Sequence, residues 1–110
     1  MPRPAETEFT REKRQWITKT HLKHARAHAT QAAALLQSDV LGDLIAIDLL
    51  IERGDFEPAM DALAALYRRL NCRAGGWRLL EKAASNIGLA DRASSYHRAF
   101  LESVANSHSA

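Results

Sequence analysis

Three histidines stand at a spacing that places them along one side of a helix. His21, His24 and His28 are three and four residues apart, and positions with this separation are neighbours on a helical surface. Such a ridge could bind a divalent transition metal or sense pH at an interface, because imidazole is a common metal ligand and titrates near neutrality. Neighbours on one ridge rarely converge on a single ion, however, and no cysteine lies nearby in the sequence. The pattern therefore favours half-buried polar residues at a boundary between helices or subunits, with no metal or other cofactor.

Basic residues surround this ridge. Residues 1–30 carry seven Lys/Arg against three Glu, although the formal net charge of the whole chain is only +2. With Trp16 as a stacking residue, this end could contact the phosphates and bases of a nucleic acid. Glu12 interrupts the cluster, so nucleic-acid binding is the alternative hypothesis rather than the leading one. The candidate partner-binding residues of this segment are Trp16, Lys19, His21, Lys23, His24, Arg26 and His28.

Sequence signatures of catalysis are missing. The chain has no glycine-rich phosphate loop, no H-E-x-x-H and no G-x-S-x-G. Four carboxylates, Asp43, Asp48, Glu52 and Asp55, are scattered around a predicted helix and its end, where helix caps and solvated edges explain them. We therefore predict that the protein has no catalytic residues and is not an enzyme.

The size and composition are those of one globular domain. The chain has 110 residues, of which 46% are hydrophobic and 25% charged, and no apolar run reaches the ~18 residues of a transmembrane helix. The N-terminus lacks the apolar segment of a secretory signal. Cys72 is the single cysteine, so it cannot form an intrachain disulfide, and it fits a reducing compartment. We expect a cytoplasmic protein that does not associate with membranes.

The elements that would position these residues are predicted to be about five helices, which makes the fold all-α. The first helix runs from Thr10, a good N-cap residue, to about Gln37, because no glycine or proline interrupts it. Its apolar face is rich in alanine. That face consists of Leu22, Ala25, Ala29, Ala32, Ala33 and Leu36.

The second predicted helix runs from Val40 to Arg53 and follows Ser38-Asp39, two good N-cap residues. It is apolar nearly all the way round, and a helix of this kind is usually covered on several sides. We therefore expect it at the centre of the fold, between the first and third helices.

Glycines mark two corners. Gly54 ends the second helix and Gly88 the fourth, because glycine adopts the left-handed conformation at little steric cost. Asp55 and Asp91 are predicted to cap the third and fifth helices, and Gly75-Gly76 to lie in the connection before the fourth. The predicted buried positions are Phe56, Ala59, Leu63, Leu66 and Leu70 in the third helix, Trp77, Leu80, Ala83, Ala84 and Ile87 in the fourth, and Ala93, Tyr96, Phe100, Leu101 and Val104 in the fifth.

The two ends of the chain differ from the middle. Residues 1–9 hold two of the three prolines and show no apolar periodicity, which predicts a disordered lead. Residues 106–110 are small and polar, and we expect a flexible tail there. The single helical domain is then predicted over residues 10–105.

The second and third helices are echoed in the fourth and fifth. Gly54 and Ala59 are each followed 34 residues later by the same residue type, Gly88 and Ala93. A period of this length is typical of stacked helical hairpins. We interpret these four residues, together with Trp77, as structural.

This pattern resembles the tetratricopeptide repeat (TPR) family, whose unit contains W-x2-L, a corner glycine and A-x3-F. Trp77 and Leu80 match the first part, Gly88 and Ala93 match the corner and the small residue, and Phe100 matches a later core position. The resemblance covers residues 40–107 as two degenerate copies.

The first copy departs from the family pattern at several positions, among them Ile47, which replaces the usual small residue. Asp43 stands at the position of the first copy that corresponds to Trp77 in the second, and Asn71 replaces the proline at the repeat end.

The resemblance implies a scaffold that binds peptides or proteins, often through a concave groove lined by the first helix of each repeat. The leading hypothesis is a non-enzymatic protein–protein interaction module, such as a small bacterial adaptor, chaperone or inhibitor-type regulator. Two repeats and one extra helix leave apolar end faces uncovered, because a repeat cannot bury its apolar surface alone. We therefore predict a homodimer or an obligate protein partner, with the alanine-rich first helix at the contact.

Overall fold

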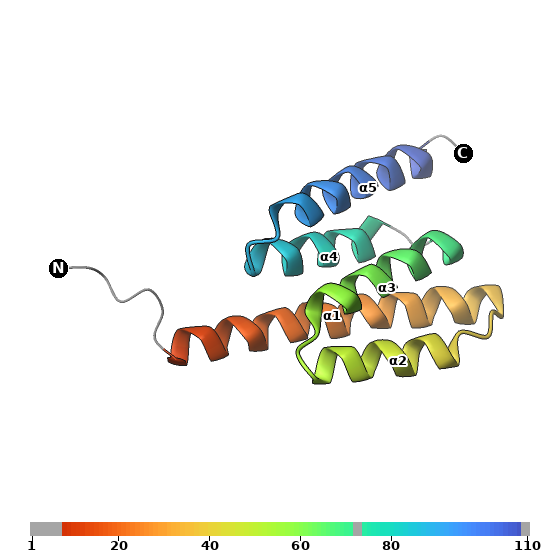
Figure 1. Cartoon of the computed structure of the whole chain (residues 1–110). Coiled ribbons are helices and arrows are strands. Elements are labelled where there is room, and N and C mark those ends of the chain that lie inside the picture. The colour runs from red at the N-terminus through yellow and green to blue at the C-terminus, as the bar shows by residue number, and fades with distance from the viewer. Residues whose placement is uncertain (1–7, 72–73, 109–110) are drawn as a thin grey trace.

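Five helices follow one another along the chain in the computed structural model, which describes residues 8–71 and 74–108 (Figure 1). They are α1 (Glu8–Leu36), α2 (Leu41–Glu52), α3 (Phe56–Leu70), α4 (Ala74–Asn86) and α5 (Ala90–His108). No strand occurs in the described residues, so the all-α prediction is confirmed. None of the helices described is long and apolar enough to cross a membrane.

The first and last helices reach further than the sequence predicted. α1 begins at Glu8, so Thr10 lies inside the helix instead of capping it. The rest of the lead predicted for residues 1–9 lies outside the described residues, as does Cys72. α5 continues to His108, through part of the segment that we expected to be a tail.

The predicted N-caps are displaced as well. Val40 occupies the N-cap position of α2, while the Asp39 Oδ1 accepts a hydrogen bond from the Leu41 N–H at 3.3 Å. Asp55 does stand at the N-cap of α3, but its side chain makes no capping bond. Asp91 lies within the first turn of α5, where a negative charge interacts favourably with the helix dipole.

Three helices end in the same hydrogen-bonded corner. At the end of α2, the N–H groups of Gly54 and Asp55 bond to the carbonyls three and five residues back, at 3.1 and 2.9 Å, which closes a Schellman motif. The residue at the turn has a left-handed backbone, with φ of 79° at Gly54, 75° at Gly88 and 54° at Gln37. The predicted glycine corners are confirmed, and Gln37 adopts the same conformation with a side chain present.

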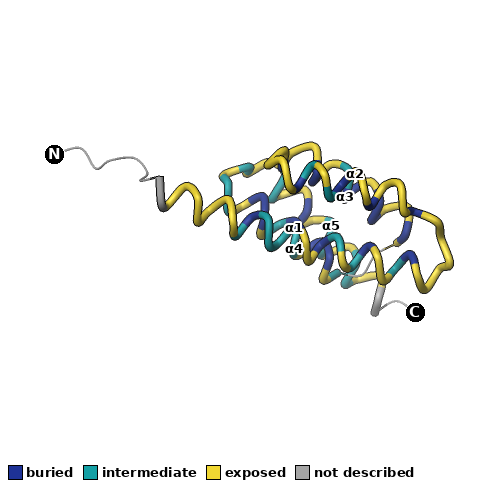
Figure 2. The backbone as a smooth tube through the Cα atoms, turned by 90° about the horizontal axis from the view of Figure 1, so that it is seen from below, coloured by how far each residue is buried: buried dark blue, intermediate teal, exposed yellow. Residues whose placement is uncertain are grey.

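α1 is the central helix of the bundle. It contacts α2, α3 and α4, whereas α2 packs on α1 and α3, and α5 packs on α4 (Figures 1 and 2). The predicted alanine-rich face lies at these contacts, because Leu22, Ala25 and Ala29 are fully buried and Ala33 nearly so. The expectation that α2 would be central is therefore wrong. Small side chains let neighbouring helices approach α1 closely, so a face of modest hydrophobicity is covered on several sides.

α2 lies at the edge of the bundle with one side uncovered. Its buried side consists of Leu44, Ile47 and Ile51. On the other side Leu41, Ile45 and Leu49 are 63%, 51% and 58% exposed. An apolar row thus remains on the surface, although the helix pattern had suggested complete coverage.

The core is one cluster with Tyr67 near its centre. The Tyr67 side chain is fully buried, and its hydroxyl donates a hydrogen bond to the Ala25 carbonyl oxygen at 2.5 Å. Its ring meets that of Trp77 edge to face, with 5.3 Å between centroids. The predicted core positions that are buried are Phe56, Ala59, Leu63, Leu66, Leu70, Trp77, Leu80, Ala83, Ala84 and Tyr96. Leu101 is 52% exposed instead.

A polar link joins α1 to α4 at the other end of the core. The Thr18 side chain is fully buried, and its Oγ1 donates to the Arg14 carbonyl oxygen at 2.8 Å. Asn86 Nδ2 donates to Thr18 Oγ1 at 2.8 Å and to the Arg14 carbonyl oxygen at 3.0 Å. Because buried polar groups are costly when unpaired, these bonds favour one register of α4 along α1.

Candidate functional site

The basic stripe of α1 is paired with α2. Lys23 Nζ lies 3.0 Å from Glu52 Oε1, and Arg26 Nε lies 3.1 Å from Asp48 Oδ1. Lys19 Nζ donates to the Glu52 carbonyl oxygen at 3.3 Å. The hydrogen bond from Lys23 lowers the pKa of the Glu52 carboxyl. These contacts hold α2 on α1. The side chains of Lys19, Lys23 and Arg26 are thus engaged by carboxylate and carbonyl groups of the same chain.

The three histidines lie on α1 without forming a metal cluster. His24 is exposed, while His21 and His28 are half-buried. Burial lowers the pKa of His21, and the nearby positive charges of Lys82 and His24 lower it further. In the part of the chain that the structure describes, no group of three His, Cys, Asp or Glu residues could hold a metal ion. A metal-responsive role therefore gains no support from this ridge.

Trp16 stands apart from the core, on the outer side of α1. Its side chain is 67% exposed, and residues 10–16 are all exposed. The structure therefore does not bring Trp16 together with the histidines or with a cavity.

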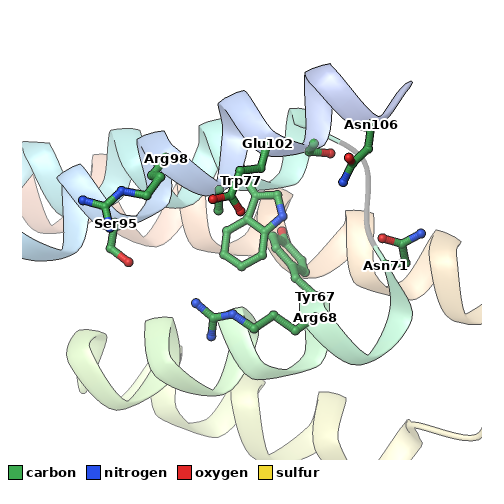
Figure 3. A pocket seen from close by; sticks show the side chains of 10 residues that line it. Tyr67, Arg68, Asn71, Trp77, Ser95, Arg98, Glu102 and Asn106 are labelled. Atoms are coloured by element: carbon green, nitrogen blue, oxygen red, sulfur yellow. The ribbon is translucent and has the colours of Figure 1, made fainter. Parts of the chain in front are cut away.

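A groove between α3 and α5 hollows the surface (Figure 3). Its volume is about 680 Å³, within the ~300–1,000 Å³ of small-ligand and peptide pockets. The lining residues are Tyr67, Arg68, Asn71, Trp77, Ser95, Arg98, Ala99, Glu102, Ser103 and Asn106. Of the partner-binding and structural residues predicted from the sequence, only Trp77 lines this groove, and it was interpreted as structural.

The two helices that form the groove are tied together near their N-terminal ends. Arg92 of α5 donates to both carboxylate oxygens of Asp61, from Nε at 3.2 Å and from Nη2 at 3.1 Å. Its Nη1 also donates to Glu57 Oε1 at 2.6 Å. These carboxylates raise the pKa of the Arg92 guanidinium. Beyond this clamp α5 diverges from α3, and the groove opens toward Asn71 and Asn106 (Figures 1 and 3).

The floor of the groove is aromatic. Trp77 is 6% exposed and lies between Tyr67 and Tyr96, with 5.3 and 6.1 Å between ring centroids. The Arg68 guanidinium carbon lies 5.3 Å from the centroid of the Trp77 ring, close enough for a cation–π contact. Burial raises the pKa of the Tyr96 hydroxyl. The floor is thus aromatic, with a cation at its edge.

Two arginines give the groove its charge. Arg68 stands on the α3 wall and Arg98 on the α5 wall (Figure 3). Neither is paired with a carboxylate in residues 8–71 and 74–108. Glu102 is the one acidic residue among the described lining residues, which together carry a net positive charge.

Comparison with known proteins found no family model, no curated protein and no solved structure that matches this chain. The resemblance to TPR hairpins therefore stays a prediction from the residues quoted above. The structure does contain two antiparallel helix pairs, α2 with α3 and α4 with α5, but α1 lies against both of them.

Proposed function

We propose that this protein is a non-enzymatic protein-interaction module that holds an acidic segment of a partner protein in the groove between α3 and α5. The observation that carries the proposal is the pair Arg68 and Arg98, which face the same groove without carboxylate partners among the described residues. An arginine has a planar fork of donors that suits a carboxylate, and this pairing is stronger in a partly covered groove than in open water.

The remaining lining residues suit a polypeptide. Asn71 and Asn106 offer amide groups that can both donate to and accept from a peptide backbone. The exposed edge of Trp77 offers an apolar contact for one side chain of the bound segment. Aromatic and arginine residues are enriched among those that dominate protein–protein binding energies.

The same lining gives no support to catalysis. The lining residues that the structure describes include the hydroxyls of Ser95 and Ser103 but no histidine or lysine that could act as a general base. We therefore propose an adaptor, chaperone or inhibitor-type regulator of the cytoplasm, as the sequence hypothesis had it, with the binding site moved from α1 to this groove.

An array of short peptides with increasing numbers of Asp and Glu tests the proposal. Binding is measured by the fluorescence of Trp77 after Trp16→Phe has removed the other tryptophan. We expect affinity to rise with acidic content and to fall at least tenfold in Arg68→Glu and in Arg98→Glu. Lys13→Glu is the matched control, because Lys13 is exposed on α1 and does not line the groove. Equal affinity for acidic and basic peptides, or an equal loss in Lys13→Glu, would refute the proposal.

A second candidate function is nucleic-acid binding through the exposed N-terminal turns of α1. It is favoured by the exposure of Trp16, next to the basic Arg11 and Lys13. This candidate predicts binding of single-stranded oligonucleotides that weakens steeply with salt and is lost in Trp16→Ala. Unaltered retention of the oligonucleotide by Trp16→Ala combined with Lys13→Glu would exclude it.

A further inference from the structure

The outward side of α2 is an apolar surface without charge. Leu41, Ile45 and Leu49 are each more than half exposed, and positions four residues apart form one row along a helix. Gly42 and Ala46, which lie beside this row, are exposed as well. The row therefore runs along most of α2, on the side away from α1 and α3 (Figure 2).

The acidic residues of α2 are engaged at the flanks of this row. Each is paired with a basic residue of α1 or α3, so none adds an unpaired charge to the outward side. The three pairs are Asp43–Arg69, Asp48–Arg26 and Glu52–Lys23. An uncharged row of this kind meets no electrostatic repulsion when it packs against an identical row.

We propose that this row packs against the same row of a second copy of the chain, with the two α2 helices antiparallel about a two-fold axis near Ile45. In such an isologous contact, Leu41 of one copy lies opposite Leu49 of the other. The contact is independent of the groove between α3 and α5. It also differs from the contact expected from sequence, because the alanine-rich face of α1 is already buried within the chain.

Opposite charges at the two ends of α2 fit this antiparallel arrangement. Arg53 follows the helix and pairs with Asp55 at 3.5 Å, and its side chain is 66% exposed, while Asp39 precedes the helix and is also exposed. At 1.5 Å per residue they lie roughly 12 and 9 Å from Ile45 along the axis. An antiparallel pair therefore brings Arg53 of each copy beside Asp39 of the other. A parallel pair would instead place like charges together.

The apolar area available is roughly two thirds of what one partner buries in a standard interface. Leu35 and Leu36 lie at the end of α1, next to the turn that leads into α2, and are 79% and 57% exposed. Together with Leu41, Ile45 and Leu49 they expose on the order of 500 Å² per copy, against about 800 Å² per partner in a standard interface. The exposed parts of Gly42 and Ala46 and of the flanking side chains add to this area.

The mass in solution tests the proposal. Sedimentation equilibrium across the micromolar range should give two chains per particle for the wild type. Ile45→Glu should give one chain, because it places a charge at the two-fold axis. Leu101→Glu is the matched control, since Leu101 is equally exposed on α5, and it should remain a dimer. Far-UV circular dichroism shows whether each variant is folded.

A cross-link tests the geometry without disturbing the fold. In a Cys72→Ser background, Ile45→Cys should form an intermolecular disulfide on mild oxidation, because two-fold symmetry brings residue 45 of both copies together. Leu101→Cys should not cross-link. A wild-type protein that is monomeric throughout this range, or equal cross-linking of the two cysteine variants, would overturn the proposal. So would an Ile45→Cys protein that cross-links to other proteins of a lysate but not to itself.

The charge pair tests the direction of packing. Arg53→Asp alone should weaken dimerisation on the order of tenfold, because two pairs are lost at once. Combining Arg53→Asp with Asp39→Arg should restore it. A double variant no better than the single one would argue against the antiparallel arrangement.

Discussion

The ring of Tyr67 lies so close to the backbone of Gly76 that a Cβ added to this glycine would stand 2.8 Å from the ring. Gly76 is thus the residue that lets the first turn of α4 approach α3. The same ring carries the hydroxyl that bonds to the Ala25 carbonyl oxygen of α1. One side chain therefore fixes the spacing of three helices and forms part of the groove floor.

Gly76→Ala should lower the free energy of unfolding by about 1–3 kcal/mol, because the new methyl group displaces a fully buried ring. Gly75→Ala is the neighbouring control. Its Cβ would stand 3.2 Å from His28 Cε1, which belongs to a half-buried side chain that can shift. We expect a change below about 1 kcal/mol there, since alanine also favours the helix. Urea denaturation at one fixed protein concentration measures both, and equal losses would contradict this explanation.

Gln37→Gly should raise the free energy of unfolding by about 1 kcal/mol, since Gln37 has a left-handed backbone that glycine adopts without steric cost. Gly88→Ala at the equivalent corner should lower it by a similar amount, about 1 kcal/mol. Thermal unfolding of the two variants beside the wild type tests the pair. A destabilised Gln37→Gly protein would mean that the glutamine side chain stabilises the turn.

Acidification below about pH 6.5, the ordinary histidine pKa, should weaken the fold in part through His21. The folded chain lowers the pKa of this imidazole by burial and by the charge of Lys82, so the unfolded chain binds the proton more readily. Stability is then fully present above the unfolded pKa and is lost as the pH falls toward the folded value. His21→Gln should flatten the fall in unfolding free energy between pH 7 and 5, and Lys82→Ala should flatten it less. A wild-type slope in His21→Gln would contradict this assignment.

Arg92→Ala should affect binding more than stability. Its ion pairs lie at the surface, so the loss in unfolding free energy should stay below about 1 kcal/mol. It would, however, release α5 from α3 and leave Asp61 and Glu57 uncompensated beside the groove, which should weaken acidic-peptide binding several-fold. Arg69→Ala removes a comparable surface pair with Asp43 and provides the control in the same titration. If Arg92→Ala and Arg69→Ala bound acidic peptides equally well, the pairing of Arg92 with Asp61 and Glu57 would not be required for binding.

The sequence was sufficient for the number of helices and for the corners at Gly54 and Gly88 because these signals are local, whereas Gly75 and Gly76, predicted in a connection, lie inside α4. A glycine after an apolar run, as at Gly54 and Gly88, fixes where a helix stops whatever surrounds it. Which helix lies at the centre does not follow from such local signals. α2 has the most apolar sequence, yet α1 is central, because close packing through Ala25 and Ala29 depends on which helices come near.

The groove could not be predicted for the same reason. Arg68 lies near the C-terminus of α3, where a favourable interaction with the helix dipole already explained it. Arg98 is one of several exposed residues on α5. Nothing in the spacing of the two indicated that the helices meet at Arg92 and then diverge, so that both arginines line one groove.

The placement of α1 against both helix pairs has a consequence for how the chain comes apart. A linear array of repeats can unravel from one end while its remaining units stay folded. Here both pairs cover α1, so the loss of either pair would expose part of the alanine-rich face of α1 that is buried in the folded chain. The molecule should therefore lose its structure in one concerted step, with hydrogen exchange in α1 as slow as the global opening allows.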